Sequence, residues 1–300
     1  MGQRDLRCKN AMHFQTFSIV VGTRACNAHC PFCISKQTGL FGTPVKVNWR
    51  NFHIACNLAQ MAKTTTVLLT GKGEPTLYPS HITETLEHLR GYKFPLKELQ
   101  TNGMIMVKDA RLDMDAYLRE WYDLGLTTIA LSVVHWDADY NKRIYNPNGE
   151  HYDLKALINR LHSIGFSVRL CVMMLKGYID SPVMVGRMID FAQTNKVEQL
   201  TFRNIHAIEV TDNPAVTQWT KEHALEAYQV QDITRGVQGT GTLLHHLMHG
   251  MDVYDVEGQN VCLGNCLTND TNGKDEFRSL IFFPDGSLFY DWQFKGARIL

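Results

Sequence analysis

Short runs of β-branched and apolar residues alternate with longer segments of helical period along the first two thirds of the chain. The runs lie at residues 17–21, 65–70, 97–101, 128–134, 167–174 and 199–205, and the helical segments at 49–62, 80–91, 112–124, 154–164 and 182–195. Runs that are mostly apolar are typical of strands buried on both faces. The alternation predicts a parallel α/β fold, which could be an open doubly wound sheet or a barrel.

Three cysteines follow the first predicted strand directly. Cys26, Cys30 and Cys33 stand in the spacing C-x3-C-x2-C within the segment CNAHCPFC. Three thiolates on one loop suit iron or zinc. A structural zinc ion or an ordinary electron-transfer cluster takes four ligands, so one coordination position stays open unless a distant residue completes the set.

Polar or glycine-rich residues stand at the ends of the later predicted strands. TGKGEP (70–75) follows the second run and QTNG (100–103) the third, while Ser132 lies within the fourth, Arg169 within the fifth, and GYI (177–179) beyond it. In barrels of parallel strands, active residues gather at the carboxyl ends of the strands. We therefore expect these groups to face one ligand.

These elements, in this order, resemble the signature of the radical S-adenosylmethionine (SAM) superfamily. The resemblance implies a partial (β/α)6 barrel of the TIM type with the cluster loop after the first strand. It also implies that Cys26, Cys30 and Cys33 hold a [4Fe-4S] cluster whose remaining iron binds SAM. The alternatives are a zinc site with a distant fourth ligand and three unrelated core cysteines.

The resemblance assigns the polar end of SAM to two of the motifs. TGKGEP resembles the family's Gly-Gly-Glu-Pro element, so Gly71, Gly73 and Glu74 would bind the methionyl amino end. QTNG resembles a third-strand element of the branch that makes the molybdenum cofactor, and Thr101 and Asn102 would offer hydroxyl and amide groups to SAM. Taken alone, each motif is also an ordinary turn.

The nucleoside part of SAM is assigned in the same way. Phe32, just before the last cysteine, and Ile179 of the GYI segment would lie near the adenine. Ser132 would hydrogen-bond the ribose or methionine part. A serine that simply bonds a neighbouring carbonyl is the alternative interpretation of Ser132.

Strand alternation adds three inward-facing residues. Arg169, Cys171 and Met173 share one face of the fifth run, and an arginine does not belong against outer helices, so this face should line the barrel. A guanidinium can grip a carboxylate with two hydrogen bonds, and we expect Arg169 to bind the SAM carboxylate. Cys171 is a candidate hydrogen-atom donor, although a small buried thiol is more often simply packed in the core.

The last hundred residues match the family less well. Cys262 and Cys266 could belong to an auxiliary cluster, but Cys8, Cys56 or a substrate atom would have to complete it. A zinc or redox pair, or plain packing, is the alternative. Residues 278–292 predict a β-hairpin with its turn at 284–286. His245, His246 and His249 are spaced to lie near one another on a helix.

Composition limits the classes of partner that we expect. The 300 residues carry 30 basic and 30 acidic side chains, so no overall field favours nucleic acid. The start of the chain has no apolar signal region and no stretch is long enough to span a bilayer, which predicts a cytoplasmic protein without a membrane partner.

The expected organisation is an N-terminal extension (1–16), a radical SAM core barrel (17–210) and a smaller C-terminal extension (211–300) that contains the hairpin. The resemblance implies an enzyme that receives one electron from a donor such as flavodoxin or ferredoxin. It would cleave SAM to a 5′-deoxyadenosyl radical that abstracts hydrogen from a small substrate, with a nucleotide or sugar nucleotide preferred. The alternatives are a radical SAM enzyme that modifies peptides and uses an auxiliary cluster, and a non-catalytic zinc or iron-sulfur protein.

Overall fold

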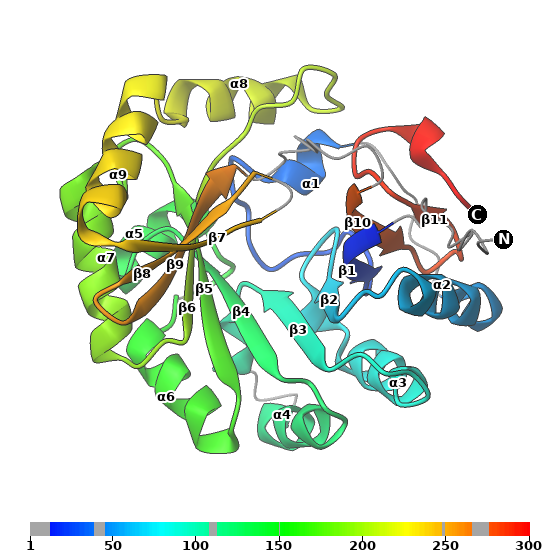
Figure 1. Ribbon diagram of the computed structural model, residues 1–300. Coiled ribbons are helices and arrows are strands. Elements are labelled where there is room, and N and C mark those ends of the chain that lie inside the picture. Colours follow the sequence, from blue (N-terminus) through cyan, green and yellow to red (C-terminus); the bar gives the residue numbers. More distant parts are fainter. Residues whose placement is uncertain (1–12, 39–45, 108–112, 150, 248–249, 266–275) are drawn as a thin grey trace, which may run out of the picture.

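Six parallel strands form the centre of the structure, a computed structural model that describes residues 13–38, 46–107, 113–149, 151–247, 250–265 and 276–300. Neighbouring strands follow in sequence order, each hydrogen-bonded to the next (Figure 1). They are β1 (His13–Val20), β2 (Thr66–Thr70), β3 (Leu96–Thr101), β4 (Thr128–Val133), β5 (Ser167–Met174) and β6 (Gln199–Asn204). All six predicted strands are confirmed.

Helices cover the outer side of these strands, as Figure 1 shows. The five predicted helices are confirmed as α2 (Trp49–Met61), α3 (Pro79–Leu89), α4 (Met114–Asp123), α6 (Leu154–Ile164) and α7 (Pro182–Thr194). Several begin where a side chain accepts a hydrogen bond from the first turn, as Asp153 does from Ala156 and Ser181 does from Met184. The short helix α5 (Ala138–Tyr145), which follows β4, was not predicted.

Each central strand divides its side chains between the helices and the interior. In β5, Val168, Leu170 and Val172 are fully buried in the main core, and Arg169 lines the interior. The even and odd positions therefore separate a hydrophobic outer layer from a more polar inner wall. This is the arrangement that the alternation in the fifth run predicted.

The C-terminal third adds strands to both edges of the same sheet. Beyond β6 lie β9 (Gln259–Asn265), which is parallel to it, and then β8 (Asp252–Val256) and β7 (Thr242–His246), which are antiparallel. Beyond β1 lie β10 (Glu276–Phe282), which is parallel to it, and β11 (Leu288–Phe289). The helices α8 (Pro214–His223) and α9 (Ala227–Thr240) precede β7, and the short helix α1 (Ile34–Gln37) follows the cysteine loop.

The prediction of a helix around the histidines was wrong. His245 and His246 lie in β7, where they pair with Val253 and Asp252 of β8. His249 lies outside the described residues. The helical spacing of the histidines was overridden by pairing with a strand that comes later in the chain, which local periodicity does not report.

The predicted hairpin is confirmed, since Phe282 of β10 pairs with Leu288 of β11. Its turn contains Gly286 at a φ of 89°, a conformation that glycine adopts easily. The fold is a mixed α/β barrel of the partial TIM type, with parallel strands around a common interior. No helix among the described residues is both long and apolar enough to cross a membrane.

Candidate active site

The interior of the barrel contains a cavity of about 920 Å³. Its wall includes eleven of the twelve residues that the sequence singled out: Cys26, Cys30, Phe32, Cys33, Gly71, Gly73, Glu74, Thr101, Asn102, Ser132 and Arg169. Ile179 is the exception, because it is fully buried in the main core and does not line this cavity. The motifs at the strand ends are thus brought to one space.

The cysteine loop connects β1 to α1 and is held by three neighbours. The backbone N–H of Glu74 donates to the carbonyl of Ala25 at 3.0 Å. The backbone N–H of His29 donates to the carbonyl of Tyr145, at the end of α5, at 2.7 Å. Asn102 donates from Nδ2 to Oδ1 of Asn27, also at 2.7 Å. The loop is therefore fixed from the second strand end, the third strand end and α5.

Gly73 allows the second strand end to approach this loop. A Cβ at position 73 would overlap the carbonyl oxygen and carbonyl carbon of Ala25. Because these are backbone atoms, no side-chain rotation relieves the overlap. The glycine of the G-x-G-E-P motif is required here for contact with the cysteine loop.

Glu74 joins the second strand end to the third. Its Oε1 accepts hydrogen bonds from the hydroxyl of Thr101 at 2.6 Å and from the hydroxyl and N–H of Thr76 at 2.6 and 3.0 Å. Its Oε2 accepts from the N–H of Asn102 at 2.9 Å. Burial raises the pKa of this carboxyl, and the four hydrogen bonds oppose that change. Oε1 accepts three of these hydrogen bonds and Oε2 accepts one, so Oε2 has capacity for another donor.

The three thiols differ in exposure but share one electrostatic environment. Cys26 is exposed, whereas Cys30 and Cys33 are half-buried. Burial raises the pKa of Cys30, and the neighbouring Cys33 and Cys26 raise it further, while Lys36 lowers it. A bound metal reverses this tendency, because a coordinating thiol is deprotonated by the metal charge.

The donor set fits an iron-sulfur cluster. Cys26, Cys30 and Cys33 lie on one loop at the cavity wall and offer three thiolates. A cluster held by three cysteines keeps one iron open for another ligand. Within the described ranges, no three His, Cys, Asp or Glu side chains converge closely enough to hold one metal ion.

An aromatic and apolar wall lies beside the cysteines. The ring of Phe32 lies 6.3 Å from that of Tyr145 and 6.4 Å from that of Trp219, measured between centroids. Ile205, just after β6, is buried in the same small cluster and lines the cavity. This wall offers a flat ligand an apolar surface next to the metal-binding loop.

Arg169 has a protein partner in the barrel. Its guanidinium forms an ion pair with Glu98 of β3, reaching across Ala130 of the intervening strand, and both side chains are largely buried. Gln100 also donates to Glu98 at 3.1 Å. An anion that binds Arg169 would therefore compete with Glu98 for the same guanidinium.

Ser132 and Cys171 occupy paired positions on β4 and β5. Ser132 lines the cavity, and its hydroxyl has no hydrogen-bond partner in the part of the chain that the structure describes. Cys171 is 4% exposed and is not part of the cavity wall. The serine is open to a ligand, whereas the thiol lies just behind the wall.

Of the two C-terminal cysteines, the structure describes Cys262. Cys262 of β9 lines the cavity beside Arg203, whereas Cys266 and Cys8 lie outside the described residues. Cys56 is fully buried in the core on α2, where it packs as an apolar residue. The expectation that Cys262 and Cys266 could hold a second cluster stays a prediction.

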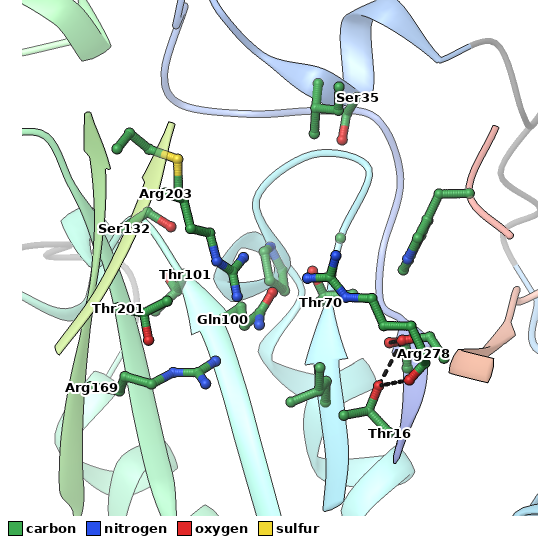
Figure 2. Close-up of a pocket in the computed structure, with 18 of the residues that line it drawn as sticks. Thr16, Ser35, Thr70, Gln100, Thr101, Ser132, Arg169, Thr201, Arg203 and Arg278 are labelled. Carbon is green, nitrogen blue, oxygen red and sulfur yellow. Dashed lines mark hydrogen bonds between the residues drawn. The ribbon is translucent and has the colours of Figure 1, made fainter. Parts of the chain in front are cut away.

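The described cavity wall carries four cations that were not predicted as site residues: Lys63, Lys72, Arg203 and Arg278. Lys72 donates from Nζ to the hydroxyl of Thr38 at 2.7 Å, and burial lowers its pKa to about 8. Arg203 of β6 and Arg278 of β10 also line the cavity (Figure 2). Alternation along β6 places Arg203 on the inner face, as it does Arg169 on β5, because Leu200 and Phe202 occupy the outer face.

Gln37 was also missed, although it closes the barrel near the cysteines. It is fully buried, and its Oε1 accepts hydrogen bonds from the hydroxyl of Thr217 at 3.1 Å and from the N–H of Ile208 at 3.2 Å. Its Nε2 donates to the carbonyl of His206 at 3.3 Å. A single glutamine thus ties α1 to the segment between β6 and α8, and its position in the sequence gives no sign of this.

Comparison with known proteins identifies the family. The model of the radical SAM superfamily matches residues 20–192, which is more than half of the chain. No curated protein matches the chain.

Solved structures share the fold at low sequence identity. SuiB from Streptococcus suis, bound to its precursor peptide SuiA, has a TM-score of 0.57 and 15% identity, covering 92% of this chain and 59% of SuiB. Methylornithine synthase has a TM-score of 0.54 and 14% identity, covering 89% and 79%. A radical SAM methyltransferase from Sphaerobacter thermophilus has a TM-score of 0.52 and 13% identity, covering 83% and 66%. This chain spans about three fifths of the length of SuiB.

Proposed function

The chain belongs to the radical SAM superfamily, whose enzymes use a [4Fe-4S] cluster and SAM, and on that premise we propose that Cys26, Cys30 and Cys33 hold the cluster. Their placement at one end of the barrel cavity supports this assignment most directly. When bound, the cluster and SAM supply a 5′-deoxyadenosyl radical that abstracts hydrogen from the substrate. The residues of the chain have to position SAM, orient the substrate and exclude water.

Glu74 and the glycines beside it are proposed to bind the amino group of SAM. Oε2 of Glu74 accepts one hydrogen bond, from Asn102, and can accept another from an ammonium group. Thr101 and Asn102 hold this carboxylate in place from the third strand end. In this arrangement they position the amino-group ligand.

The nucleoside is proposed to lie along the apolar wall. Phe32 and Ile205 offer the adenine an apolar surface beside the cluster loop, and the hydroxyl of Ser132 is open to the ribose. Ile205 is better placed than Ile179, which does not line the cavity. Arg169 remains our candidate for the SAM carboxylate, in competition with Glu98.

The electron is proposed to enter from the exposed side of the cysteine loop. Cys26 is exposed, and so are Arg24 and Lys36 on either side of it. Two cations at this surface favour an acidic protein donor such as flavodoxin or ferredoxin, because complementary charge steers association. We infer a cytoplasmic location, where such donors operate and thiols stay reduced.

A small substrate inside the barrel is our first choice. The cavity of about 920 Å³ also has to hold most of SAM, which leaves room for a molecule of metabolite size. A peptide substrate is the second candidate, favoured by the likeness in fold to SuiB, which was solved with a precursor peptide. About four irons per chain after anaerobic reconstitution support a single cluster, whereas about eight would add an auxiliary cluster and favour the peptide.

The test is transfer of an isotopic label. Reduced, reconstituted enzyme is supplied with SAM and deuterated candidate substrates, and 5′-deoxyadenosine is analysed by mass spectrometry. Deuterium in 5′-deoxyadenosine would identify the substrate class and the reacting carbon. A protein that binds metal but leaves SAM intact after reduction would refute the proposed function.

A further inference from the structure

The cavity wall is cationic although the whole chain is neutral. Its described wall carries Lys63, Lys72, Arg169, Arg203 and Arg278, whereas Glu74 is the one carboxylate among the described lining residues. The full chain balances 30 basic against 30 acidic side chains. Positive charge is therefore concentrated where a substrate would bind, and a cleft lined by one sign of charge raises the local concentration of oppositely charged ligands.

Arg203, unlike Arg169, forms no ion pair with a carboxylate of the described residues. It lies on the inner face of β6, paired in register with Met173 and four residues further along the sheet than Arg169. At a strand rise of about 3.3 Å per residue, this places it about 13 Å nearer the end of the barrel that carries the cysteine loop. Its Nε is buried and has no hydrogen-bond partner among the described residues. A buried guanidinium nitrogen in this state is costly unless a ligand binds it.

Arg278 faces Arg203 from the opposite wall. It stands on β10, and five strands separate β10 from β6 in the order of the sheet. Figure 2 shows the two side chains extending toward one another from opposite sides, with Thr70 and Gln100 between them. Two guanidinium groups that approach from two sides can enclose one anion.

The neighbouring groups do not neutralise Arg203. Cys262 lines the cavity beside Arg203 and offers a thiol, not a carboxylate. Glu98 is already bound by Arg169 and Gln100. The SAM carboxylate is planar and one guanidinium fork satisfies it, so the geometry of the opposed pair suits a second anion.

We infer that the substrate carries a phosphoryl group, which Arg203 and Arg278 bind from opposite walls. A tetrahedral phosphoryl group presents oxygens in several directions and so suits two forks that do not share a plane, whereas a carboxylate suits one. This inference rests on the proposed function, since it names the chemical class of the substrate for that same cavity.

Binding of inorganic pyrophosphate tests the inference without any turnover. Anaerobically reconstituted enzyme saturated with SAM is titrated with pyrophosphate in a calorimeter, and with malonate at equal ionic strength as the carboxylate probe. We expect pyrophosphate to bind more tightly than malonate. Arg203→Gln and Arg278→Gln should each weaken pyrophosphate at least about tenfold while leaving SAM affinity unchanged. Arg235→Gln is the matched control, because Arg235 is an exposed arginine paired with Asp232 on α9.

Three results would overturn the inference. Unchanged pyrophosphate affinity in both variants would place the anion elsewhere. Tighter binding of malonate through the same arginines would assign a carboxylate substrate. Loss of SAM affinity in Arg203→Gln, with pyrophosphate binding intact, would assign Arg203 to the cofactor. None of these results depends on whether reduction cleaves SAM, so failure here is distinguishable from failure of the proposed function.

A measurement on the unmodified enzyme covers the case in which a variant does not fold. Crystals of the SAM-bound enzyme are soaked with tungstate, a tetrahedral anion with strong anomalous scattering. We expect an anomalous peak between the guanidinium groups of Arg203 and Arg278. Tungstate bound only at other positions would contradict the inference.

Discussion

Asn102 donates a hydrogen bond from Nδ2 to Oδ1 of Asn27 at 2.7 Å, so the turn after β3 holds the residue next to Cys26. The same Asn102 donates its backbone N–H to Glu74. Asn102 therefore connects the carboxylate of the second strand end to the cysteine loop.

Replacing Asn102 by Asp should impair cluster assembly. A carboxylate at this position would face the carbonyl oxygen of the Asn27 amide and the nearby carboxylate of Glu74, so a hydrogen bond becomes a repulsion. We expect iron and sulfide per chain to fall by about half or more, as measured by chemical analysis after anaerobic reconstitution. Asn51→Asp is the control, since Asn51 bonds the carbonyl of Gly286 away from the site. Equal iron content in both variants would show that the link is dispensable.

A methyl group at Gly73 should displace the cysteine loop. In Gly73→Ala the new Cβ overlaps the backbone of Ala25, and only movement of one of the two segments can relieve it. We expect cluster content and SAM cleavage to fall at least about tenfold, measured by iron analysis and by chromatography of 5′-deoxyadenosine. Gly186→Ala is the matched control, because Gly186 lies within α7 with open space around its Cβ position. That change should stabilise the protein by about 0.5–1 kcal/mol or leave it unchanged.

Stability should fall at mildly acidic pH because of His81. Its Nδ1 accepts the N–H of Gly22 at 3.0 Å, which requires the unprotonated nitrogen, and burial lowers its pKa to about 4. Above pH 6.5 the side chain is neutral in both folded and unfolded chains. Between pH 6.5 and 4 only the unfolded chain gains the proton, so the free energy of unfolding falls by at most about 3 kcal/mol.

His81→Asn isolates this contribution. The amide oxygen of asparagine can accept the same N–H without titrating, so the pH dependence of the variant should be flatter. Melting temperatures of both proteins are compared between pH 4.5 and 8, and their difference should change with pH. Parallel curves would mean that His81 is protonated in the folded protein at these pH values.

Arg169→Ala should weaken SAM binding by at least about tenfold if its guanidinium binds the SAM carboxylate. The single change also leaves Glu98 as an unpaired buried charge, which can cost about 3–5 kcal/mol of stability. The double variant Arg169→Met with Glu98→Met removes both charges and avoids that cost. SAM affinity, measured by calorimetry, should fall in the double variant as well. Unchanged affinity would mean that Arg169 serves only its ion pair with Glu98.

The central barrel could be predicted from the sequence because its strands are buried on both faces. Each gave a continuous apolar run, and the helices between them kept a helical period with clear N-caps such as Asp153 and Ser181. The positions of the edge strands in the sheet could not be predicted in this way. Their places depend on pairing between segments far apart in the chain, such as β10 with β1, and no local pattern encodes such a partner.

The candidate site was predictable where short motifs stand at strand ends. Eleven of twelve predicted residues line one cavity, and Ile179 does not because its side chain points into the core. The resemblance to the radical SAM family assigned Glu74 a ligand-binding role, and the structure adds that its carboxylate connects two strand ends. Such a network is invisible in sequence because Thr76, Thr101 and Asn102 are common residues in ordinary turns.

The central claim is tested most directly by the 5′-deoxyadenosine that forms from SAM. Wild-type protein and Cys30→Ala are reconstituted anaerobically, reduced with dithionite and supplied with SAM, and the products are quantified by chromatography. We predict 5′-deoxyadenosine and methionine from the wild type and none above background from Cys30→Ala. Equal formation of 5′-deoxyadenosine by the two proteins, or none by a wild type that contains its cluster, would contradict the account.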